Sequence, residues 1–428
     1  MLAAPRAAPR APTWLVICAT LLLGLTLVGA PAPSAVTPVE LSLAGLVGLG
    51  ALWIVGGVLV RPMPLDDAQP LLLAAVGGYL ASFALSMVVG VAYGAPTLSM
   101  LRAVLPYVLF LPIAAVGLMP SVRDGAVRGI LVACVLAGLA HSALLLGLYL
   151  TGVQNLLDTQ TILVGRTTLL DARTTLPLFL GAAVLPLHVV ARGSWPARVG
   201  AIALMALAAL GSFSTQTRAQ LLALGCAYVA FFFLYSRWEA RMRGDHPTLA
   251  FLRFGRRAAI TTALLAATIL ATPPLRALAS AVVLRSQATG DNGRIQEEWI
   301  PVITEALQHG VTGVLFGIGG GQSFITIAGE ERTYVHNLML YALLYNGAIG
   351  LLLVLFLYLA LFATLVRRAH VQRSAVYLSF ASLLVALFVY AQLFAVHKLL
   401  SFNAMLALVI FVAFVRPVRL RSADDAGC

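Results

Sequence analysis

Residues 336–365 read HNLMLYALLYNGAIGLLLVLFLYLALFATL, a histidine and an asparagine followed by a nearly unbroken apolar run. A run of about 20 apolar residues is long enough to cross a bilayer as an α-helix. We therefore expect a membrane helix with a titratable side chain where it meets a polar loop. On a helix, residues three and four apart lie on one face, which groups His336 with Leu340 and Gly347. Gly347 and Gly350 would then let a neighbouring helix approach closely on the His336 side.

The composition of the whole chain points to the same class. The 428 residues are 61% hydrophobic and only 10% charged, with a mean hydropathy of +0.95. A soluble domain needs a more polar exterior than this, so we predict an all-α polytopic membrane protein, folded as a single membrane-embedded domain over 1–428. About 12 transmembrane helices are predicted from apolar runs of sufficient length. The predicted spans are 13–31, 36–60, 69–94, 99–119, 127–151, 174–191, 197–213, 218–236, 258–273, 336–366, 374–396 and 399–415.

The basic residues give an orientation. With the N-terminus in the cytoplasm, 19 of the 28 basic residues fall in cytoplasmic segments and nine outside. This bias follows the positive-inside rule, so both termini are expected in the cytoplasm. The net charge of +12 is then explained by topology, and no nucleic-acid partner is predicted.

One long segment outside the spans, 274–335, is expected on the outer face between helices nine and ten. It contains a predicted amphipathic helix that would rest on the rim of the bundle or at the bilayer interface. Its predicted apolar face comprises Ile295, Trp299, Val302, Ile303, Ala306 and Leu307, with Glu297, Glu298 and Glu305 opposite in solvent. A glycine-rich turn follows at 316–322, which fits a flexible connection better than an anion-binding loop.

Four outer arginines are candidate phosphate ligands. Arg218 follows Ser214-Thr215-Gln216-Thr217, which can cap a helix, so its guanidinium would join the amides of a helix N-terminus in an anion site. Arg294 would open the amphipathic helix, Arg166 lies in the outer loop 152–173, and Arg102 opens the fourth span. For Arg102 and Arg218, a side chain that snorkels to the membrane interface is the alternative.

These elements together resemble a known family. Arg218 with Leu222, Gly293-Arg294 with Trp299, Leu315 to Gly319, and His336-Asn337 followed by Gly347 and Gly350 resemble the bacterial O-antigen ligases. Those enzymes share a superfamily with O-antigen polymerases and protein O-oligosaccharyltransferases. The resemblance covers residues 210–370. It implies that polysaccharide is moved from undecaprenyl diphosphate to a sugar hydroxyl of the lipid A–core, completing lipopolysaccharide. The reaction would take place at the periplasmic face of the bacterial inner membrane, among membrane lipids.

A diphosphate leaving group needs positive charge, from a metal ion or from arginines. The acid pairs on the outer side, Glu297-Glu298 and Glu330-Glu331, are interpreted as solvated, so Arg218, Arg294, Arg166 and Arg102 are the predicted ligands. Neither a metal nor another cofactor is predicted.

His336 is the predicted general base for the acceptor hydroxyl, with inversion at the anomeric carbon, and Asn337 and Gly347 support it. A helix N-terminus and nearby arginines disfavour the imidazolium form, so we expect a neutral ring.

Two alternatives stay open. An O-antigen polymerase would use the same donor with a lipid-linked acceptor, and the sequence does not separate it from a ligase. A secondary transporter with 12 helices belongs to another class, in which repeats and polar residues at the middle of the membrane are typical. In this chain the polar residues gather at the outer rim and no repeat is evident.

Overall fold

The computed structural model describes residues 69–108, 114–118, 124–150, 172–214, 218–244 and 295–415, with a few single residues between them. This part of the chain is mostly helical, and five of its helices are long and apolar enough to cross a membrane. The protein is therefore an all-α, polytopic membrane protein. Those five are contained in α3 (Gln69–Ala92), α6 (Asp124–Leu150), α11 (Arg218–Arg243), α17 (Leu338–Val371) and α18 (Val376–Leu393).

Shorter helices complete the described bundle. They are α4 (Thr97–Val108), η1 (Val116–Leu118), α8 (Ala172–Val184), α9 (Leu187–Arg192), α10 (Trp195–Ser214), η3 (Ala395–Lys398) and α19 (Leu400–Phe414). Predicted span 99–119 is represented by α4, which contains Pro106, and by η1. Predicted spans 13–31, 36–60 and 258–273 lie outside the described residues, apart from single positions.

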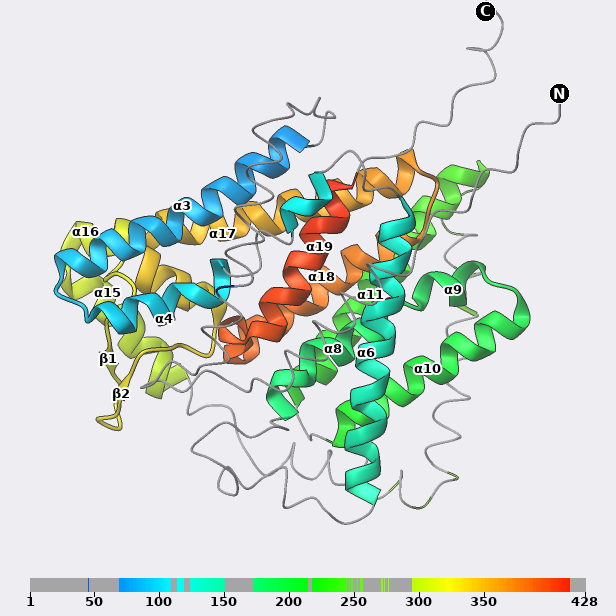
Figure 1. Cartoon of the computed structure of the whole chain (residues 1–428), viewed down its shortest axis with the longest axis horizontal. Helices are drawn as coiled ribbons and strands as arrows, with labels where there is room; N and C mark the ends of the chain where they lie inside the picture. The colour runs from blue at the N-terminus through cyan, green and yellow to red at the C-terminus, as the bar shows by residue number, and fades with distance from the viewer. Residues whose placement is uncertain are drawn as a thin grey trace, which may run out of the picture.

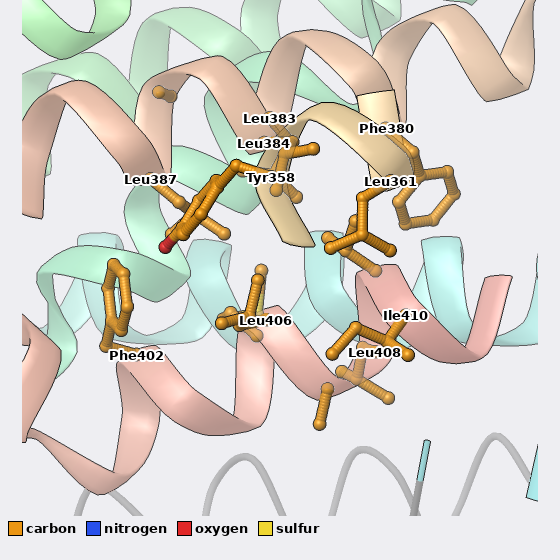
Figure 2. Close-up of a cluster of buried hydrophobic side chains, with 14 of the residues drawn as sticks. Tyr358, Leu361, Phe380, Leu383, Leu384, Leu387, Phe402, Leu406, Leu408 and Ile410 are labelled. Carbon is orange, nitrogen blue, oxygen red and sulfur yellow. The ribbon is translucent and has the colours of Figure 1, made fainter. Parts of the chain in front are cut away.

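The helices pack into a bundle in which α3 runs beside α17, and α11 beside α18 (Figure 1). The core between α17, α18 and α19 is filled by aliphatic and aromatic side chains, among them Leu361, Leu384 and Leu406 (Figure 2). These buried side chains contact only other protein atoms, and their close packing fixes the relative positions of the helices.

Side-chain hydrogen bonds to main-chain carbonyls tie the helices together at the end of the bundle where α17 finishes. The Trp238 indole donates to the carbonyl of Ala369 at 2.9 Å, and the Gln69 amide donates to that of Phe414 at 2.8 Å. Arg368 donates to the carbonyl of Val415. Because α11 ends beside the end of α17, its first residue lies toward the opposite end of the bundle, where α17 begins.

Helix α17 is broken at Gly347, whose φ of 66° and ψ of −170° are not helical. Two carbonyls just before the break accept hydrogen bonds from other segments: Ile318 N donates to the Leu344 carbonyl at 2.7 Å and Ser86 Oγ to the Tyr345 carbonyl at 2.9 Å. In a membrane protein a helix break persists only when such groups are satisfied. The backbone of Leu315 and Phe316, at the end of α16 (Gly310–Phe316), occupies the place of a Gly347 side chain.

The close approach predicted at Gly347 is thus present, but the reasoning from a single helical face is wrong. His336 precedes the helix, and the break at Gly347 rotates everything after it. At Gly350 the three nearest atoms to an added side chain belong to Asn346 of α17 itself.

The glycine-rich turn is also different from its prediction as a flexible connection. Residues 317–321 are buried, and Gly320 N donates to the Ser86 carbonyl of α3 at 2.9 Å. Gly319 and Gly90 meet backbone to backbone, with no room for a side chain on Gly319. The amides of Ile318 and Gly320 are used inside the protein, so they cannot form an anion cradle.

The segment that was predicted to face outward, called the outer segment below, is described from residue 295 and forms a small cap at one end of α3 and α17 (Figure 1). It consists of a π-helical turn η2 (Ile295–Trp299), α15 (Ile300–Gln308), α16, and the antiparallel strands β1 (Phe324–Ile325) and β2 (Glu331–Arg332). Its predicted polarity is confirmed only in part. Val302 and Ala306 of the predicted apolar face are buried and Glu297 is exposed, whereas Ile295, Ile303 and Leu307 are exposed and Glu298 is buried.

Candidate active site

His336 lies in the loop between β2 and α17, one residue before the helix cap. Asn337 caps α17: its side-chain Oδ1 accepts from Leu340 N at 3.0 Å, and its Nδ2 donates to the Gln392 carbonyl at 3.1 Å. The cap fixes the start of α17 and ties it to the end of α18. The predicted supporting role of Asn337 therefore has a structural basis, in holding the residue that precedes it.

The His336 ring is held by Glu298. Its Nδ1 lies 3.0 and 3.1 Å from the two carboxylate oxygens, and its backbone N–H donates to the same carboxylate at 2.8 Å. Glu298 is 1% exposed, while the His336 side chain keeps 21% of its surface accessible. The prediction that Glu298 is a solvated side chain is wrong, because η2 turns it under the loop that carries His336.

The contacts of Glu298 explain its charge. Burial alone would raise the pKa of the Glu298 carboxyl, but the hydrogen bonds and charge of His336, with the charge of Arg332, hold it below its usual value. A carboxylate at Nδ1 selects the tautomer with the proton on Nδ1 and leaves Nε2 as the proton acceptor. The arginines expected around the ring are replaced, at Nδ1, by an acid that stabilises the imidazolium once a proton is taken.

A second group of polar side chains lies next to this pair, on η3. Lys398 Nζ donates to the carbonyl of Thr333 at 2.6 Å and lies 5.4 Å from the ring centroids of both Tyr334 and Tyr341. The Tyr334 ring is in turn 5.2 Å from the His336 ring. His397 is fully buried, 4.9 Å from the ring of Tyr341. Burial lowers the pKa of Lys398 to about 7.

The structure describes two of the four predicted arginines, Arg102 and Arg218. Arg102 lies on α4, the helix that packs on η3 and whose Ala103 carbonyl accepts from the Tyr341 hydroxyl at 3.2 Å. Nε and Nη2 of Arg102 are buried. Arg218 opens α11, so its prediction as a first-turn residue is confirmed. Arg166 and Arg294 lie outside the described residues.

Sequence reasoning missed Glu298, His397 and Lys398. The signal for Lys398 was compositional: it is the one lysine in a chain with 27 arginines, and it stands beside a histidine. Within the described residues, no three His, Cys, Asp or Glu side chains come together as a metal site would require.

The fold and site define a class: a polytopic helical membrane protein with a carboxylate–histidine pair where a broken helix begins. Comparison of the chain with models of known protein families and with curated protein sequences finds no match.

Proposed function

We propose that the protein is a glycosyltransferase of the O-antigen ligase type. It transfers a polysaccharide from undecaprenyl diphosphate to a sugar hydroxyl of the lipid A–core, at the periplasmic face of the bacterial inner membrane. The observation that carries the proposal is the Glu298–His336 pair. The buried carboxylate of Glu298 binds both the backbone N–H and the ring Nδ1 of His336, and this orients the ring. This arrangement prepares Nε2 to accept the proton of an attacking hydroxyl.

The chemistry follows from these parts. The acceptor hydroxyl loses its proton to Nε2 of His336 as its oxygen attacks the anomeric carbon, and Glu298 stabilises the resulting imidazolium. The bond from the anomeric carbon to the diphosphate oxygen breaks on the opposite face, so the configuration inverts. Positive side chains stabilise the departing diphosphate, for which Arg218, Arg294, Arg166 and Arg102 remain the proposed ligands, without a metal ion.

The test is transfer by purified protein in a bilayer, with undecaprenyl diphosphate-linked polysaccharide as donor and lipid A–core as acceptor. His336→Ala is expected to lower the transfer rate by about 10²–10⁴, because proton transfer typically contributes that much. Donor binding should persist. His309→Ala is the matched control, since this histidine also pairs with a glutamate (Glu305, 3.4 Å) in the same outer segment.

Equal loss in the two variants, or full activity of His336→Ala, would contradict a base at His336. Deletion of the gene separates a ligase from a polymerase, the alternative that uses a lipid-linked acceptor. A ligase leaves full-length lipid-linked polysaccharide to accumulate, and a polymerase leaves single repeat units.

A further inference from the structure

The ammonium group of Lys398 has no acid beside it. It donates to the main-chain carbonyl of Thr333 and lies over two tyrosine rings, and no carboxylate within the described residues pairs with it. Glu298, the buried acid of the neighbouring pair, is bound to His336. A charge that is partly removed from water without a counter-ion is unfavourable unless something anionic completes the site.

The surrounding elements do not supply that anion. The titratable or charged side chains on the parts of α4, α17, α18, η3 and the loop that surround Lys398 are all basic or neutral, and α19 carries none. They are Arg102, Tyr107, Tyr341, Tyr390, His397, Tyr334 and His336. Burial, followed by the charges of Lys398 and His336, lowers the pKa of His397, so that ring is uncharged at neutral pH. Lys398 is therefore a basic group with no acidic partner among these side chains, and an anionic ligand would supply one.

The position of Lys398 beside His336 indicates which anion it binds. Thr333, whose carbonyl accepts from the ammonium, precedes His336 by three residues, and the Tyr334 ring lies 5.4 Å from Lys398 Nζ and 5.2 Å from the His336 ring. A group bound by Lys398 is therefore close to the atoms on which His336 acts. We propose that Lys398 binds a phosphate of the lipid diphosphate donor beside His336, an inference that rests on the proposed function.

Binding of a phosphate would stabilise the protonated amine. Burial lowers the pKa of Lys398 in the free protein to about 7, so the amine is only partly protonated near neutral pH. A bound diphosphate diester, which keeps its charge across this range, must raise that value and take up a proton. Binding should accordingly weaken as the pH rises above 7, by up to about tenfold per pH unit until the pKa of the bound state is reached.

The experiment uses the fact that Lys398 is the single lysine. Reductive methylation with ¹³C labels only this side chain and the α-amino group, and methylation retains the charge. NMR in a phosphate-free detergent then gives the titration midpoint of Lys398 directly. The probe is citronellyl diphospho-N-acetylglucosamine, and its control is citronellyl N-acetylglucosaminide, which lacks the diphosphate. The expected result is a midpoint near 7 that moves up by at least one pH unit with the diphosphate probe alone.

Three results would overturn the proposal. The first is a midpoint that stays in place while the probe binds, the second is an equal shift with the phosphate-free control, and the third is an equal shift with phosphatidylglycerol. In the last case the site would belong to a lipid headgroup. In all three, loss of transfer in His336→Ala would leave the proposed function standing. A wild-type protein that binds no diphosphate probe would instead contradict the function itself.

Binding measurements on variants of Lys398 provide a second, independent test. Lys398→Met is expected to weaken probe binding about tenfold or more at pH 6.5, because a charge-assisted hydrogen bond is lost. Lys398→Arg should retain binding and lose its pH dependence between 6 and 8. The matched control is Arg332→Gln, which removes a nearby cation that is already paired with Glu330 at 2.6 Å. If Arg332→Gln weakens binding as much as Lys398→Met, only general electrostatic attraction is at work, and the proposal fails.

Discussion

Glu298 and His336 are 38 residues apart in sequence, yet a single carboxylate oxygen of Glu298 lies within hydrogen-bond distance of both the backbone N–H and the ring Nδ1 of His336. Two contacts to one residue fix both the position of the loop and the rotation of the ring. The pair thereby joins the outer segment to the start of α17, and each side chain fixes the orientation of the other.

We expect the transfer rate to depend on the negative charge of the Glu298 side chain rather than on its shape. Glu298→Gln can still accept a hydrogen bond but cannot stabilise an imidazolium, so we expect the transfer rate to fall by about 10²–10⁴ with donor binding retained. The control is Glu297→Gln, since Glu297 is the exposed neighbour in the same turn. Similar rates for Glu298→Gln and Glu297→Gln in the purified transfer assay would rule out the orienting role.

The same carboxylate makes stability depend on pH. Because the pKa of Glu298 is lowered in the folded protein, its contribution to stability is present above the unfolded value, near 4.5, and is lost as the pH falls through the lower folded value. The difference in melting temperature between the wild type and Glu298→Gln should be constant from pH 7 to about 5 and shrink below about 4.5. Thermal melting in detergent at several pH values measures it. A difference that grows at low pH would contradict the assigned direction.

Gly347 should tolerate no side chain. Gly347→Ala forces an alanine into a left-handed conformation, which costs about 1–3 kcal/mol in strain, and its methyl group overlaps the backbone of Leu315. We expect a lower melting temperature and reduced transfer, because α16 and the outer segment must move. Gly77→Ala in α3 is the control, since no atom lies within 4 Å of its added methyl group. Equal melting temperatures for these variants would show that the break is adaptable.

Membrane topology gives a separate test. Trp238 bonds to Ala369 near the end of α17, whereas His309 and Gly310 lie in the cap near its start. A reporter fused near residue 245 should therefore be cytoplasmic and one near residue 310 periplasmic, in line with the distribution of basic residues. A cysteine-labelling experiment with an impermeant reagent checks the same point. If both positions are labelled from the same side, or in the reverse pattern, the prediction fails and His336 has no access to a periplasmic substrate.

Hydropathy was sufficient to predict the five long apolar helices of the described residues, since the length of an apolar run is a local property. It predicted α17 and α18 to within a few residues of their observed ends. The break in α17 escaped prediction because Asn346-Gly347 fits a continuous helix as long as the backbone of α16 is not known to lie against it.

The site was harder to predict, and the reason is geometric. His336 was identified from its place at the end of an apolar run, but Glu298 was assigned to solvent because helical periodicity grouped it with Glu297 and Glu305. Glu298, Val302 and Ala306 are spaced four residues apart and are all buried, so the inward face is rotated toward Glu298 from the face that was predicted. A contact across 38 residues depends on how the outer segment folds over α17, which no local pattern contains.

The meeting of Gly90 and Gly319 has a consequence for how the protein can vary. In the core between α17, α18 and α19, one aliphatic residue can replace another when volume is conserved. Where α3 meets the outer segment, the contact is between main-chain atoms, so even a single added methyl group on Gly319 has no space. A saturation scan of the chain would accordingly find its strictest positions among the smallest residues. The seat of the outer segment on α3 is thus specified by the small size of these two residues.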